Sequence, residues 1–108
     1  MKLKKNNLEI SLFDMIYYYF KYRKLDIVGV AIKTDDEIYI MTKPNRHDNI
    51  IDMVYHKYNK IVANINNKEQ GFILSNGLFV NRIEAAKIAC VKGVFIKTPP
   101  KLFSEDLW

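Results

Sequence analysis

The sequence has little cysteine, glycine and proline, and these shortages exclude several kinds of protein. It contains one cysteine, four glycines and three prolines among 108 residues. A single cysteine, Cys90, can form neither an internal disulfide nor a cysteine-based metal site within one chain. Cys90 falls in the apolar pattern of a predicted helix, so we expect a small buried hydrophobic residue there. No stretch is rich in glycine or proline, and we therefore expect no flexible linker.

The sequence also lacks a long hydrophobic run. No apolar stretch reaches the roughly 18–20 residues that a membrane-spanning helix needs. The basic start, Met1–Asn7, is not followed by the apolar region and small-residue cleavage site of a signal peptide. We therefore expect a soluble, cytoplasmic protein with no membrane partner.

Composition and charge fit one small globular domain. Hydrophobic residues make up 49% and charged residues 27% of the chain, close to the globular average. A domain of this size buries a modest core, so an exposed apolar face would suggest oligomerisation. The net charge of +5 can steer the protein toward nucleic acid or toward an acidic protein, but it identifies neither.

Three segments are predicted to be helices. The first begins at Ser11, a suitable N-cap, and runs to about Lys24 with apolar or aromatic residues around most of its circumference. A helix of that kind is normally buried on more than one side. Apolar spacing predicts a second helix over about 48–58. The third covers 83–91, with Asn81 and Glu84 in capping-box spacing, and ends at Gly93.

Strands are predicted between the helices. Two β-branched stretches, 25–32 and 38–41, form a strand pair. A hairpin follows at 72–80, where Asn76-Gly77 is typical of a type I′ turn. A short strand is expected at 94–96, and 59–70 fits either a helix extension or a loop. This order predicts an α+β fold, a small and mostly antiparallel sheet of hairpins with about three helices packed on it. We expect one structural domain, with an aromatic and basic helical segment at 1–24 and an α+β core at 25–108.

Three ordered motifs resemble a family of small bacteriophage and prophage proteins. They are Gly71-Phe72 with Ser75–Ala89, Arg46–Ile51, and the ending Ser104–Trp108. The resemblance covers about 25–108 and leaves the aromatic helix outside. Asn81 occupies a position where the family commonly has Asp. Residues 91–94 occupy positions where relatives often have a Gly-Gln pair. The resemblance implies a phage or prophage origin, a compact α+β fold and a place in the host bacterial cytoplasm. It implies no activity.

The Arg46-His47-Asp48 junction is the candidate ligand site. A helix N-terminus favours an anion, Arg46 could clamp a phosphate, and His47 could exchange a proton while Asp48 orients it. The alternative is structural: Asp48 caps the helix, Arg46 forms a salt bridge, and His47 is simply hydrogen-bonded. Arg82 either joins this anion site or holds the acidic tail. We assign no catalytic residue, metal ligand or cofactor.

The aromatic helix is the candidate partner interface. Its residues mix aromatic rings with positive charge, a pattern that suits a core or homodimer contact, another protein, or single-stranded nucleic acid. The candidate interface residues are Tyr17, Tyr18, Lys21, Tyr22 and Arg23.

These features favour a non-catalytic binding protein over an enzyme. With a phage origin, the expected partner is a host defence protein or complex, which a protein of this kind would inhibit as an anti-CRISPR does. The alternative is a small nucleotide- or phosphate-binding module or enzyme centred on Arg46-His47-Asp48.

Overall fold

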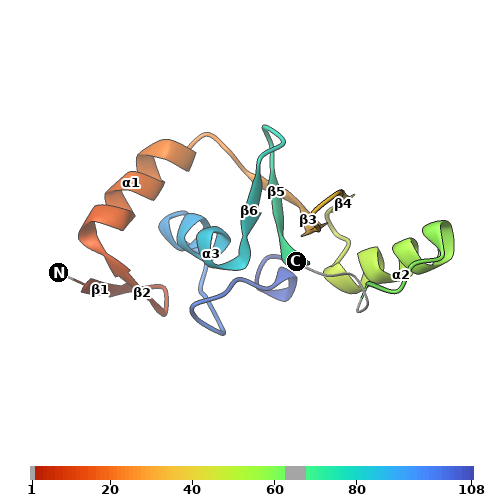
Figure 1. Cartoon of the computed structure of the whole chain (residues 1–108). Helices are drawn as coiled ribbons and strands as arrows, with labels where there is room; N and C mark the ends of the chain where they lie inside the picture. Colours follow the sequence, from red (N-terminus) through yellow and green to blue (C-terminus); the bar gives the residue numbers. More distant parts are fainter. Residues whose placement is uncertain (1, 63–67) are drawn as a thin grey trace. The chain divides into compact units, whose positions relative to one another are not determined.

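The protein folds as two antiparallel sheets with helices packed on them, which confirms the α+β prediction (Figure 1). The computed structural model describes residues 2–62 and 68–108. Within that described part the elements are β1 (Lys2–Lys5), β2 (Leu8–Ser11), α1 (Leu12–Tyr22), β3 (Ile27–Lys33), β4 (Ile38–Thr42), α2 (His47–Tyr58), β5 (Glu69–Leu74), β6 (Phe79–Asn81), α3 (Arg82–Val91) and the short 3₁₀ helix η2 (Ser104–Asp106).

The chain divides into two units. One contains Met1–Asp26 together with Arg82–Trp108, and the other is the continuous segment Ile27–Asn81. We refer to the first as the terminal unit and to the second as the sheet unit. The aromatic helix α1 therefore groups with the C-terminal residues of the chain.

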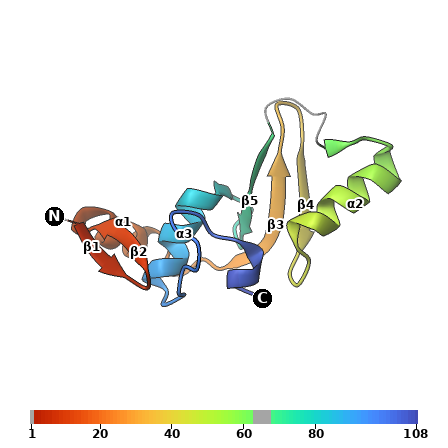
Figure 2. The same cartoon turned by 90° about the horizontal axis from the view of Figure 1, so that it is seen from below.

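The sheet unit has the strand order β4-β3-β5-β6, with every neighbouring pair antiparallel. Alternation along β3 puts Val30 and Ile32 on one face, where Val30 lies between Met41 and Phe72 of the neighbouring strands. Ile50 and Val54 of α2 are completely buried, and α2 lies alongside β3 and β4 (Figure 2). The predicted strand pair and second helix are confirmed to within one or two residues. The sequence left open whether this helix extends beyond Tyr58. Helix α2 ends at Tyr58, and the next residue, Asn59, has a positive φ; Ala63 lies outside the described residues.

The Asn76-Gly77 hairpin forms, but the predicted type I′ turn is wrong. Leu74 N donates to Leu78 O at 3.0 Å and Gly77 N to Leu74 O at 2.8 Å. Gly77 has φ +86°, whereas Asn76 is not among the residues with positive φ. This is the three-residue loop in which a type I turn is followed by a left-handed glycine. The Asn-Gly pair fits both turns, so the sequence predicted the hairpin but not its loop length.

A hairpin that the sequence did not suggest opens the terminal unit. β1 and β2 pair antiparallel from Lys2 opposite Ser11 to Lys5 opposite Leu8. The two loop residues, Asn6 and Asn7, have φ of 49° and 70°. Asparagine tolerates positive φ, so the two-residue turn with positive φ at both positions occurs here.

The β1–β2 turn also organises the chain after α3. Asn6 Nδ2 donates to Cys90 O at 2.8 Å, and Asn7 Nδ2 donates to Ile96 O at 2.8 Å. Ile96 N donates to Asn6 O at 2.9 Å. The predicted strand at 94–96 is wrong, since these residues attach to a turn rather than to the edge of a sheet. Cys90 is buried as predicted, and burial raises the pKa of its thiol.

Helix α3 begins directly after Asn81, which is where the sequence placed its N-cap, and it ends as predicted before Gly93. Gly93 has φ +96°, and its N–H donates to Cys90 O at 3.1 Å. A positive φ of this kind is the usual reason for glycine after a helix C-terminus. Ala85, Ala86, Ile88 and Ala89 are buried, so α3 is the central helix of its unit.

The C-terminal tail is part of the terminal unit. Leu102 is completely buried, and its N–H donates to Arg82 O at 3.0 Å. The Arg82 guanidinium lies 4.3 Å from the centre of the Phe103 ring. Ser104 is buried, and Asp106 Oδ2 accepts from Phe103 N at 3.0 Å. Of the apolar residues of the tail, Leu102 lies in the core, whereas Phe103, Leu107 and Trp108 are half-buried.

Gly71→Ala tests the packing of β5 on β6. A Cβ on Gly71 would contact Val80 O and would lie 2.6 Å and 2.8 Å from two atoms of the Phe79 ring. We expect a loss of about 2 kcal/mol in unfolding free energy, because backbone and a ring must both shift. Gly77→Ala is the matched control, with open space but a positive φ, and should cost about 1 kcal/mol. Urea denaturation measures both, and an equal or smaller effect at Gly71 would contradict the account.

Truncation after Leu102 tests the tail. Removing Phe103–Trp108 deletes the ring under Arg82 and the buried Ser104. We expect a loss of about 3 kcal/mol in unfolding free energy, since the truncation removes several partly buried apolar side chains. Lys101→Ala, an exposed neighbour, should change stability by less than about 0.5 kcal/mol. An unchanged melting temperature on truncation would refute a structural role for the tail.

Candidate protein-binding surface

Helix α1 presents an apolar face to solvent. Ser11 caps the helix as predicted, with its hydroxyl accepting from Asp14 N at 3.0 Å. Phe13, Ile16 and Phe20 share one side of the helix through i, i+3 and i+7 spacing. Phe13 is 77% exposed and Phe20 63% exposed. We call this surface the aromatic face; its members, all more than two-fifths exposed, are Leu12, Phe13, Ile16, Tyr17, Tyr19 and Phe20.

The opposite side of α1 faces its own unit. Tyr22 is only 4% exposed and is the one buried residue of the helix. Tyr18 stacks on Tyr22 with ring centres 5.5 Å apart, and burial raises the pKa of its hydroxyl. Lys87 of α3 bonds to Asp14 at 3.1 Å. The expectation that α1 is buried on more than one side is therefore wrong, because its unit covers one side only.

Positive charge borders the aromatic face. Lys21 Nζ donates to the Tyr17 hydroxyl at 2.7 Å and lies 5.1 Å from the centre of that ring. This hydrogen bond raises the pKa of Lys21. Arg23 lies 5.8 Å from the Phe20 ring centre. Each cation lies against one of these rings, so the surface has an apolar centre with a basic margin.

Two hollows adjoin this surface within the terminal unit. One has a volume of about 290 Å³ and is lined mainly by apolar side chains of α1, with Lys5 and Val91. The second, of about 390 Å³, is lined by Tyr19, Arg23, Asp26, Val91 and Lys92. Tyr19 and Val91 line both, so an apolar hollow adjoins one that carries charged side chains. A binding partner with an apolar side chain next to an acidic one would fit these two hollows.

The sequence named part of this surface. Of the candidate interface residues, Tyr17, Lys21 and Arg23 are exposed, whereas the structure places Tyr22 inside and Tyr18 half-buried. The sequence did not single out Phe13, Ile16, Tyr19 and Phe20 as interface residues. Aromatic residues occur around nearly the whole helix, so helical spacing alone could not say which side a partner helix would cover.

The Arg46-His47-Asp48 junction is arranged differently from a phosphate clamp. His47 is 6% exposed, and its Nε2 lies 2.8 Å from Gly71 O. The ring also contacts Phe72 edge-on, with centres 5.2 Å apart. Arg46 is exposed and is itself the N-cap of α2, and its backbone N–H donates to Asn49 Oδ1 at 2.8 Å, so Asp48 is not the cap of this helix. His47 is therefore a buried, hydrogen-bonded residue, as the structural alternative expects.

Arg82 is held within the terminal unit. Its guanidinium stacks on Phe103, burial lowers its pKa, and the charge of Glu105 opposes that shift. These contacts agree with the view that Arg82 holds the tail.

Among the described residues no group of three or more His, Cys, Asp or Glu side chains is placed to hold a metal ion. No helix in the described part of the chain is long and apolar enough to cross a membrane.

Paired substitutions on α1 test which side is free. Phe13→Ser and Phe20→Ser should each change the unfolding free energy by less than about 0.5 kcal/mol, because neither ring is buried. Tyr22→Ala should cost about 3 kcal/mol, because it empties a buried site. Thermal and urea denaturation provide the comparison. A large loss of stability at Phe13 or Phe20 would show that the aromatic face is covered in the native protein.

Comparison with known proteins gives the origin of the chain. The family described as Phage T4 y16D protein has a model that matches residues 26–108. The match begins after α1, whose residues therefore lie outside it. No curated protein matches the chain, and no solved structure does. The predicted phage family is confirmed at that level, and the chain belongs to the Phage T4 y16D protein family of small phage proteins.

Proposed function

We propose that this phage protein is a non-catalytic binding protein that inhibits a host defence protein or complex through the aromatic face of α1. The observation that supports it most is the exposure of Phe13 and Phe20 on one side of a helix whose other side is packed. Isolated exposed apolar residues are ordinary, but a contiguous set with a polar border marks an interaction surface. Aromatic residues also dominate the energy of protein interfaces.

The chemistry of the face describes the partner. The chain carries a net charge of +5, and Lys21 and Arg23 border the face. The partner should therefore have an apolar groove or helix face with acidic residues at its edge, because complementary charge speeds association and excludes wrong partners. A second copy would bring the same basic border against itself. Single-stranded nucleic acid is disfavoured, because Tyr17 and Phe20 are already covered in part by cations of the same chain.

The phosphate-binding alternative has weaker support. It rests on Arg46 beside the first turn of α2, but Asp48 adds a negative charge to that turn. The His47 ring is buried against Gly71 O and Phe72. A proton-transfer role would require this ring to leave that position. The arrangement therefore favours the aromatic face as the functional surface.

A phage plating experiment tests the proposal. A phage lacking the protein is plated on host strains that each carry one defence system, with wild-type protein or a variant supplied in the host. We expect wild type to restore plating on at least one strain. The variant with both Phe13→Ser and Phe20→Ser should lose this activity, since two anchors of about 2 kcal/mol each lower affinity by about 1000-fold.

The matched control is Phe95→Ser, which removes a ring of similar exposure, 59%, from outside α1. It should retain full activity. Arg46→Ala should also retain activity, whereas the phosphate-binding alternative requires its loss. If wild type restores plating on no strain, or if the double variant works as well as wild type, the proposal is wrong.

A further inference from the structure

A second apolar surface lies in the sheet unit, at the outer edge of β4. β4 is the terminal strand in the order β4-β3-β5-β6. In the hairpin, Thr34 N donates to Glu37 O at 2.8 Å, and Lys43 N donates to Val28 O at 3.0 Å. Hydrogen-bonded positions alternate along an antiparallel strand. The backbone groups of Ile38, Ile40 and Thr42 therefore point away from β3, toward the open edge.

The open edge lacks the usual protection against pairing. β4 reads Ile-Tyr-Ile-Met-Thr, without a charged residue or a proline. Ile38 and Ile40 are each 46% exposed. Edge strands that stay unpaired normally carry lysine, proline or a bulge. Within the described residues only Thr42 O has a backbone partner on this edge, accepting from Asn45 N at 3.1 Å.

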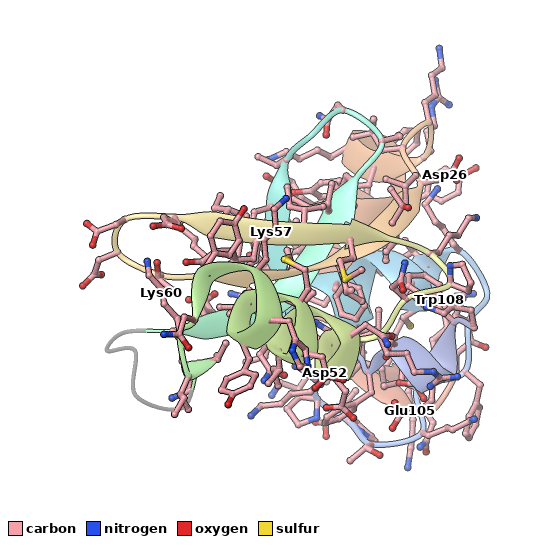
Figure 3. The ribbon with its side chains drawn as sticks, turned by 90° about the vertical axis from the view of Figure 1, so that its right-hand side faces the viewer. Asp26, Asp52, Lys57, Lys60, Glu105 and Trp108 are labelled. Carbon is pink, nitrogen blue, oxygen red and sulfur yellow. The ribbon has the colours of Figure 1, made fainter. Side chains whose placement is uncertain are left out.

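The charges at the two ends of β4 are opposite in sign. The turn before the strand contains Asp35, Asp36 and Glu37, and the strand is followed by Lys43. Lys60 bonds to Glu37 at 3.3 Å and lies beside the hairpin tip in Figure 3. If two β4 strands pair antiparallel, each acidic turn lies next to the basic end of the other strand. Parallel pairing would put like charges together.

From this edge we propose that two copies of the chain associate through β4 in antiparallel orientation, so that their sheets join into one. With Ile40 on the two-fold axis, the outward N–H and C=O groups of each Ile40 bond to the other copy. Thr42 N of each chain then bonds to Ile38 O of its partner, and Glu37 faces the partner's Lys43. The exposed Ile40 side chains meet at the axis, and each exposed Ile38 lies opposite the partner's Thr42. The occupant is thus a second copy, because one strand supplies both halves of the complementarity.

Sedimentation equilibrium of the full chain, from micromolar to millimolar concentration, tests this pairing. Wild type should be a dimer at the upper end of the range. Ile40→Lys should raise the dissociation constant by about 100-fold or more, because two like charges meet at the axis. Leu78→Lys is the matched control, since Leu78 is also 46% exposed but lies in the β5–β6 turn. It should leave the dissociation constant unchanged, with folding of both variants checked by circular dichroism.

A second variant leaves the apolar edge intact. Lys43→Glu should weaken the dimer by about tenfold, because it opposes the acidic turn of the partner. A wild type that stays monomeric throughout the concentration range would overturn the proposal. It would also be overturned if Ile40→Lys and Leu78→Lys had equal effects, or if Phe20→Lys and not Ile40→Lys abolished the dimer. The outcome is independent of the plating experiment, which tests α1 alone.

Discussion

The limited capacity of two small cores shapes this protein. Each unit contains about half of the 108 residues, and small units bury a low fraction of their apolar surface. The sheet unit covers one face of its sheet with α2, where Ile50 and Val54 are completely buried. The terminal unit packs α1 by one side only, where Tyr22 is buried. Apolar surface that neither core can cover stays exposed on α1 and β4, and these are the surfaces to which we assign function.

Much of the fold could be predicted because local signals decided it. Ser11 marked the start of α1, Gly93 marked the end of α3, and β-branched runs marked β3 and β4. These signals act within a few residues of the chain. The errors arose where two local conformations compete. Asn76-Gly77 suits two turn types, and Asn6-Asn7 formed a turn between short strands whose pattern was too weak to recognise.

The candidate sites were harder to predict because exposure depends on distant residues. The sequence showed that α1 is aromatic, but its packing in the terminal unit, which includes contacts with α3 and β2, decides that Tyr22 is covered and Phe13 is not. The sequence placed His47 between Arg46 and Asp48 at a helix N-terminus, where it could exchange a proton. Its hydrogen bond to Gly71 O, 24 residues away, commits the ring to the sheet unit. A linear motif reports which chemistry a residue offers, and packing decides whether that chemistry reaches solvent.

Site-specific photo-crosslinking tests the central claim, that α1 binds a host protein, most directly. A photoreactive phenylalanine analogue is placed at Phe20 or, in a separate variant, at Phe95, which has nearly the same exposure. Both variants are produced in infected host cells and irradiated. The account predicts that position 20 yields one predominant host-protein adduct and that position 95 yields none. Equal adducts at both positions, or none at position 20, would contradict it.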